Sequence, residues 1–375
     1  MMESQIERLQ HGIVGSFDEH CLMQGDDIAV YTDDSYYIKD SRDSNDDDDD
    51  DEEIGISYLE IQFNYQSLAA QLYHRFGVRE NDNVLLLLKE GNTAAEITSI
   101  LACARLGSPF VPVDPEWMHF GSRFKSIIED VNPVAAIVVG KNDDDEMVQL
   151  LASLKIYRIA LINEDGTPVM EEASVSDIRS DLPVLKSYSL LEDNSNSNDI
   201  IVPPLYVLFT SGSSGKPKGV KGSHHGLLNR IQWQYSKFPY ELGEVAARRT
   251  PLTFVDSVVE IMAPLLAGVP LSTIKKEAIT ALGLSGIAER ASKVGVTRLT
   301  ILPSQLSMAI KIDKSIGSKW HCLKYIVVSG EPCYSLLLKD VQSAFPNAYF
   351  INLYGSTEVS GDVTYAILQL SLIHI

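Results

Sequence analysis

Cysteine is scarce in this sequence, and long apolar runs are absent from it. The 375 residues include four cysteines, which are widely spaced and form no Cys-x-x-Cys pair. Neither a zinc-binding cysteine cluster nor a disulfide framework is therefore indicated. No apolar run approaches the ~20 residues that cross a membrane, and the N-terminus lacks the basic and apolar regions of a signal peptide. We expect a cytoplasmic protein without a membrane span.

Positive charge is also in short supply. There are 31 lysines and arginines against 51 aspartates and glutamates, which gives a net charge of −20. Eight of the acids form the single run Asp46–Glu53, and we expect residues 41–53 to be a disordered acidic loop. Because duplex nucleic acid usually needs a basic face, nucleic acid is not an expected partner.

Short apolar runs alternate with helical patterns along the chain, which favours an α/β fold with mostly parallel sheets flanked by helices. The predicted strands are Val84–Leu88, Phe110–Val113, Ala135–Val139, Tyr157–Ile162, Leu205–Phe209, Arg298–Leu302, Tyr325–Val328 and Tyr349–Leu353. The predicted helices are Asn92–Leu106, Phe120–Val131, Met147–Leu154, Gly222–Tyr235, Val258–Leu266, Thr280–Val294 and Tyr334–Phe345.

An apolar strand followed by a small, polar loop is the most informative feature. The loop consists of Thr210, Ser211, Gly212, Ser213, Ser214 and Gly215, and Lys218 follows it. It offers backbone N–H groups, hydroxyls and positive charge, as a polyphosphate requires. A Walker A loop is excluded because Pro217 follows Gly215-Lys216 and the earlier glycine is missing. A flexible surface linker is the remaining alternative.

The loop resembles the phosphate loop of the adenylate-forming (AMP-binding) superfamily, which includes acyl-CoA synthetases, luciferases and nonribosomal peptide adenylation domains. Residues 106–115 resemble a second core motif, and Asn352–Glu358 matches Asn-x-Tyr-Gly-x-Thr-Glu residue by residue. Residues 227–230 and 353–364 look most similar to plant acyl-activating enzymes of the β-alanine-activating, aminoadipate-semialdehyde-dehydrogenase type. The resemblance covers nearly the whole chain and implies the large N-terminal α/β domain of these enzymes, with stacked sheets.

The resemblance also implies ATP and Mg²⁺ as cofactors and gives roles to individual residues. In the third motif Tyr354 stacks on adenine, Thr357 bonds the α-phosphate and Glu358 holds Mg²⁺, while Lys218, Thr357 and Glu358 are the catalytic candidates. The remaining nucleotide-binding candidates are the loop residues 210–215 with Gly330, Glu331, Pro332, Asn352, Gly355 and Ser356. A helix cap at the Thr-Glu pair and a strand-to-helix turn at residues 329–332 are the structural alternatives.

The substrate position departs from the family pattern. Amino-acid-activating relatives read Phe-Asp-x-Ser-Val-x-Glu, in which the aspartate anchors the ammonium group of the substrate. Here Val255 stands at that position and Asp256 follows it. Asp256 and Ser329 are candidate substrate residues, but a plain carboxylic acid substrate and a helix N-cap role for Asp256 stay open. His224 is expected to have a structural role.

Later family motifs have no counterpart in this sequence, namely the ribose-binding segment, the hinge and the C-terminal lysine. We therefore expect residues 1–365 to be an incomplete N-terminal adenylation domain. The last six residues translate a common sequencing-adaptor end, so we expect a non-native tail over residues 366–375.

The predicted function is ATP-dependent activation of a carboxylic or amino acid as an acyl-adenylate. In the intact enzyme the acyl group would pass to CoA or to the phosphopantetheine arm of a carrier domain, which the resemblance allows in the same chain. The fragment is expected to be impaired. A non-catalytic nucleotide- or acyl-binding module is the alternative, and a protein kinase is disfavoured because Asp-Phe-Gly and His-Arg-Asp elements are missing.

Overall fold

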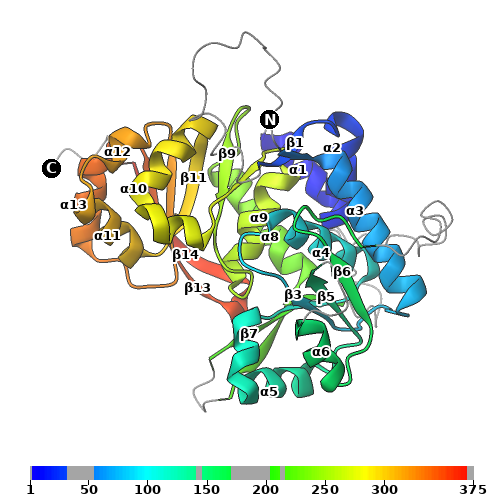
Figure 1. The fold of residues 1–375 in the computed structure, drawn as a ribbon. Helices are drawn as coiled ribbons and strands as arrows, with labels where there is room; N and C mark the ends of the chain where they lie inside the picture. Colours follow the sequence, from blue (N-terminus) through cyan, green and yellow to red (C-terminus); the bar gives the residue numbers. More distant parts are fainter. Residues whose placement is uncertain (1, 32–54, 141–145, 170–202, 212–215, 370–375) are drawn as a thin grey trace, which may run out of the picture.

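The computed structural model describes residues 2–31, 55–140, 146–169, 203–211 and 216–369. It contains two β-sheets with helices between and around them (Figure 1). The expected acidic loop over residues 41–53 and the loop residues Gly212, Ser213, Ser214 and Gly215 lie outside the described residues.

A six-stranded sheet is formed in the order β6-β5-β3-β4-β7-β8. All neighbouring strands are parallel except β7 and β8, which pair antiparallel. The strands are β3 (Val84–Leu87), β4 (Phe110–Pro112), β5 (Ala135–Val139), β6 (Ile159–Ile162), β7 (Pro204–Thr210) and β8 (Lys218–Ser223). Helices α5 (Gly121–Val131) and α6 (Glu146–Ser153) pack against one face of this sheet (Figure 1).

An eight-stranded sheet has the order β14-β13-β12-β11-β9-β10-β1-β2, with antiparallel pairs only at its two edges. Its strands are β1 (Ile28–Tyr31), β2 (Gly55–Ser57), β9 (Val245–Arg248), β10 (Leu271–Thr273), β11 (Val296–Ile301), β12 (Tyr325–Val328), β13 (Tyr349–Ser356) and β14 (Gly361–Gln369). Helices α10 (Lys276–Val294), α11 (Pro303–Ile312), α12 (Ile316–Lys319) and α13 (Ser335–Ala344) gather at the β11–β13 end of the molecule (Figure 1).

The largest core joins the two sheets. It is built around α4 (Thr93–Leu106), in which every residue except Arg105 is buried, so the helix is covered on all sides. The other helices of this layer are α1 (Met2–Arg8), α2 (Gly12–Gln24), α3 (Tyr58–Ala70), α8 (His224–Lys237) and α9 (Val255–Leu266). Burial of so much apolar surface supplies the main driving force that holds the sheets in fixed relation.

The predicted mixed, mostly parallel α/β architecture is confirmed, but several boundaries differ. The helix predicted from Gly222 begins at His224, because Gly222 and Ser223 belong to β8, which was not predicted. Two glycines in six residues give β8 little intrinsic strand preference. Pairing with β7 determines its structure, and a Cβ on Gly222 would lie 1.9 Å from Tyr206 Cζ.

The end of the described chain is also ordered as a strand. Strand β14 pairs with β13 over most of its length, and Ala366 lies opposite Asn352. The expected domain boundary at residue 365 therefore falls inside β14, and residues 370–375 lie outside the described residues.

Candidate active site

The predicted phosphate-binding residues meet where β13 ends and β8 begins. Ser356 donates a hydrogen bond to Glu358, and this bond, with the backbone N–H of Glu358 and the charge of Lys218, lowers the pKa of the Glu358 carboxyl. Both Lys218 and Glu358 are exposed to solvent. Residues separated by 140 positions thus form one electrostatic site, in which a carboxylate stays ionised beside a lysine.

The motif Asn352–Glu358 runs along the end of β13 and into the 3-10 turn that follows it. Asn352 pairs with the last residue of β12, and the Tyr354 side chain is 72% exposed, so its ring presents a free face. Thr357 and Glu358 open a 3-10 turn, Thr357–Val359. A helix cap at the Thr-Glu pair is therefore not observed.

Backbone packing next to this turn is close. A Cβ on Gly355 would lie 1.7 Å from the carbonyl oxygen of Gly361, so only glycine permits the approach of β13 to β14. At the other strand end, Thr210 is the last residue of β7 and Ser211 is exposed. The strands β7 and β13 belong to different sheets. Thr210 pairs with Lys218 on β8, and the charge of Lys218 acts on Glu358, so the Asn352–Glu358 motif and the described part of the phosphate loop belong to one site.

Residues 329–332 connect β12 to α13. Gly330 has φ +79°, in the left-handed region that favours glycine. Glu331 accepts a hydrogen bond from the backbone N–H of Ser304 at 3.1 Å and so supports the N-terminus of α11. Pro332 does not begin a helix, because α13 starts at Ser335 after Tyr334. The segment is therefore a strand-to-helix turn in which the proline precedes the helix by three residues.

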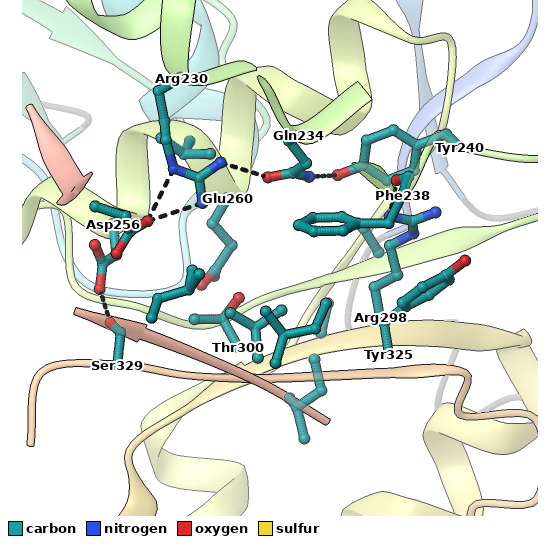
Figure 2. Close-up of a pocket in the computed structure, with 18 residues that line it drawn as sticks. Arg230, Gln234, Phe238, Tyr240, Asp256, Glu260, Arg298, Thr300, Tyr325 and Ser329 are labelled. Carbon is teal, nitrogen blue, oxygen red and sulfur yellow. Dashed lines mark hydrogen bonds and ion pairs between the residues drawn. The ribbon is translucent and has the colours of Figure 1, made fainter. Parts of the chain in front are cut away.

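Asp256 and Ser329, the two predicted substrate residues, lie together at one end of a cavity of about 60 Å³ (Figure 2). Ser329 Oγ donates a hydrogen bond to Asp256 Oδ2, although the residues are 73 positions apart. Asp256 is the second residue of α9, whose N-cap is Phe254, so the N-cap alternative for Asp256 was wrong. Val255 is buried in the core between the sheets.

The electrostatic environment of Asp256 is unusual for a carboxylate. Burial, followed by the charge of Asp362, raises the pKa of Asp256 to about 6 from its ordinary value of 3.8. The Ser329 hydrogen bond and the charge of Arg230 act in the opposite direction. Among the ion pairs of the described residues, none includes Asp256. Its carboxylate therefore offers a place for a cation.

Four residues that were not predicted as site residues complete this wall, namely Arg230, Asp362, Gln234 and Tyr240. Arg230 Nε and Nη2 lie 2.9 and 2.8 Å from Asp362 Oδ2, and both side chains are more than nine-tenths buried. Arg230 Nη1 donates to Gln234 Oε1 at 3.2 Å, and Gln234 in turn donates to Tyr240 OH at 3.0 Å. The segments that carry Arg230 and Asp362 were among those that resemble the family. Nothing in the sequence indicated that these two residues form an ion pair.

A buried charge network supports the loop that leads to Asp256. Arg248 donates to Glu96 Oε2 at 2.9 Å and to Glu260 Oε1 at 3.3 Å, and all three side chains are at most 3% exposed. Glu260 also accepts a hydrogen bond from the backbone N–H of Thr250 at 2.9 Å. The network therefore anchors Arg249 and Thr250, at the start of the loop, to Glu260 on α9.

His224 and the second cavity lie outside the predicted chemistry. Burial lowers the pKa of His224 to about 4, so the imidazole is neutral near pH 7, as a structural role requires.

A larger cavity of about 770 Å³ opens at the ends of β3 and β4, with Glu90, Asp114 and Lys276 among its lining residues. None of the predicted site residues lines it.

Comparison with known proteins decides the family. A family model described as AMP-binding enzyme matches residues 17–373. The chain belongs to the AMP-binding enzyme family. Members of this family use ATP, and the similar curated proteins are synthetases and ligases.

Two relatives and one solved structure illustrate the similarity of this AMP-binding chain. The beta-alanyl-bioamine nonribosomal peptide synthetase ebony of Drosophila melanogaster is 32% identical over 281 residues, which cover 72% of this chain and 29% of that protein. Vanchrobactin synthetase VabF of Vibrio anguillarum is 28% identical, over 82% of this chain and 10% of its own length. The structure of IdnL1 superposes with a TM-score of 0.72 at 19% identity, covering 98% of this chain and 64% of that one, and supports the fold.

These similarities correct one expectation about the family and show how much of each relative the chain matches. The curated relatives reported above are a nonribosomal peptide synthetase of an insect and a vanchrobactin synthetase of a bacterium, so the resemblance is not specific to plant β-alanine-activating enzymes. The chain spans less than a third of the length of either relative. Within the described part of the chain, no helix has the length and apolarity needed to cross a membrane.

The residues present fit the ATP and Mg²⁺ that the AMP-binding family implies. No cluster of three metal-ligating side chains occurs among the described residues. An exposed, ionised Glu358 beside Lys218 is nevertheless a suitable hard oxygen ligand for a cation whose other ligands are phosphate oxygens and water.

Proposed function

We propose that this protein activates a small amino acid as an aminoacyl-adenylate at the expense of ATP. The observation that carries the proposal is the Asp256–Ser329 pair in the small cavity beside β12 and β13. Asp256 lacks a cationic partner among the described residues, and burial disfavours its negative charge. An ammonium group of the substrate would supply the missing positive charge.

We further propose that the amine is on the β-carbon of the substrate, as in β-alanine. Relative to the amino-acid-activating pattern, the anchoring carboxylate is displaced by one residue, from position 255 to position 256. An amine one carbon farther from the substrate carboxylate suits such a displaced anchor. The printed name of the 32% identical relative, a beta-alanyl synthetase, and the small size of the cavity support the same substrate class.

The chemistry follows from the arrangement of the phosphate site. A carboxylate oxygen of the substrate attacks the α-phosphorus of ATP, an O–P bond forms, and the bond to the β-phosphate breaks to release pyrophosphate. Lys218 neutralises charge that develops on the phosphates, Thr357 bonds the α-phosphate, and Tyr354 holds the adenine ring. Mg²⁺ held by Glu358 would add further charge neutralisation. Asp256 binds the ammonium group of the substrate and so orients the substrate. Holding the two reactants in this position contributes to the rate acceleration.

The adenylate then passes to a thiol. We propose the phosphopantetheine arm of a carrier domain as the acceptor, because the 32% identical relative is a nonribosomal peptide synthetase. CoA is the alternative acceptor. Thioester formation on a purified carrier domain, as opposed to free CoA, would separate these acceptors by mass spectrometry.

Substrate-dependent pyrophosphate exchange by the full-length protein tests the proposal. We expect exchange with β-alanine to exceed exchange with alanine and propionate. Asp256→Asn should reduce exchange with β-alanine by about 10- to 100-fold, the value of one charged hydrogen bond. Asp26→Asn, at an exposed aspartate before β1, is the matched control and should behave as the wild type. Equal exchange with propionate and β-alanine would favour a plain carboxylic acid substrate.

A further inference from the structure

Two aspartates line the small cavity, and only one of them is neutralised. Asp362 on β14 receives both the Nε and the Nη2 hydrogen bonds of Arg230. Asp256 on α9 receives only the hydroxyl of Ser329 among the described residues. Glu260 and Arg298 also line the cavity, but each is paired with a residue outside it, Glu260 with Arg248 and Arg298 with Glu244. Asp256, Asp362 and Arg230 therefore leave one negative charge uncompensated.

Arg230 is fixed in the position where it neutralises Asp362. Gln234, one turn further along α8, accepts from Nη1 and is itself held by the hydroxyl of Tyr240. The guanidinium also lies over the ring of Trp233, 4.5 Å from its centroid. Figure 2 shows Arg230 above Asp256, with Gln234 and Tyr240 extending away from the cavity end that holds Ser329. A guanidinium held from three sides cannot readily swing to Asp256.

We propose that Arg230 is a specificity-determining residue: by neutralising Asp362 it limits the cavity to one ammonium group and so discriminates against diamino acids. This inference rests on the proposed function, since it assumes an amino acid in this cavity. A substrate with two ammonium groups would bring the second one close to a guanidinium, where like charges repel. Without Arg230 the same wall would present two unpaired carboxylates, those of Asp256 and Asp362, and accept two ammonium groups.

The test compares β-alanine with 2,3-diaminopropionate in pyrophosphate exchange by the full-length protein. The readout is the ratio of kcat/KM for the two acids. Arg230→Gln should shift this ratio toward the diamino acid by about tenfold, as expected for one charge–charge interaction. Arg230→Lys keeps the charge and should retain the preference for β-alanine. An unchanged ratio in Arg230→Gln would overturn the inference.

Removing the two charges of the pair, one at a time and together, provides an independent readout. Asp362→Asn leaves Arg230 without its partner and should disfavour the diamino acid further. The double variant Arg230→Gln/Asp362→Asn again leaves one net negative charge and should return the ratio toward the wild-type value. A double variant that keeps the diamino preference of Arg230→Gln would contradict the charge argument. If the wild type activates neither acid, the proposed function fails rather than this inference.

Discussion

Replacing Asp256 with asparagine should stabilise the free protein while it removes the proposed amine anchor. In the folded protein the pKa of Asp256 is raised to about 6, whereas its ordinary value is 3.8. One pH unit of difference corresponds to about 1.4 kcal/mol, so ionising Asp256 costs the fold up to about 3 kcal/mol. Asparagine removes this charge and keeps an oxygen that can accept the hydrogen bond of Ser329.

The stabilisation should depend on pH in a defined direction. Between 3.8 and about 6 the folded protein holds a proton at Asp256 that the unfolded chain has lost, so wild-type stability falls as the pH rises through this window. Asp256→Asn should therefore resemble the wild type near pH 4 and exceed it in stability above pH 6. Because the cavity admits solvent, which screens the charge, we expect a gain of about 1–3 kcal/mol in free energy of unfolding.

Urea denaturation of both proteins near pH 4 and above pH 6 measures the effect. A second series with β-alanine links it to function, because the substrate ammonium would pair with Asp256 and stabilise the wild type but not the variant. Equal stability of the two proteins above pH 6 would refute the electrostatic account of this site. Equal stabilisation of both proteins by β-alanine would refute the anchor.

Two further predictions concern the phosphate site and the buried charges. Lys218→Ala should lower pyrophosphate exchange by about 100-fold or more, as for loss of a transition-state charge partner, whereas Lys221→Ala, at an exposed position on the same strand, should leave it unchanged. Arg248→Met should lower the free energy of unfolding by about 3–5 kcal/mol, because it leaves Glu96 and Glu260 buried without their partner. Lys125→Ala, which removes an exposed i,i+4 pair, should change it by less than about 1 kcal/mol. Similar losses in a test and its control would contradict the corresponding argument.

The two segments of the candidate phosphate site could be predicted from sequence because each follows an apolar strand. The loop after β7 and the motif at the end of β13 were recognised separately, and ligands in open α/β sheets bind beyond the carboxyl ends of strands. The electrostatic coupling of Lys218 and Glu358 agrees with that expectation.

The direction of the Asp256 side chain could not be predicted from the sequence, because it depends on the local backbone conformation. On an extended strand, adjacent residues point to opposite faces, whereas on a helix they differ by about 100° around the axis. Helix α9 begins at Val255, three residues earlier than predicted, so Val255 enters the core and Asp256 reaches the cavity. The ion pair Arg230–Asp362 could not be predicted from the sequence either, because it joins a helix to an edge strand 132 residues away.

Isotope transfer in a single turnover tests the central claim most directly. The full-length protein would react with ATP and β-alanine whose carboxylate carries the heavy oxygen isotope, and hydroxylamine would then release the acyl group. Direct attack of the carboxylate on the α-phosphorus predicts AMP that carries one labelled oxygen, together with pyrophosphate and the hydroxamate of β-alanine. Formation of ADP, or of AMP without the label, would contradict adenylation at this site.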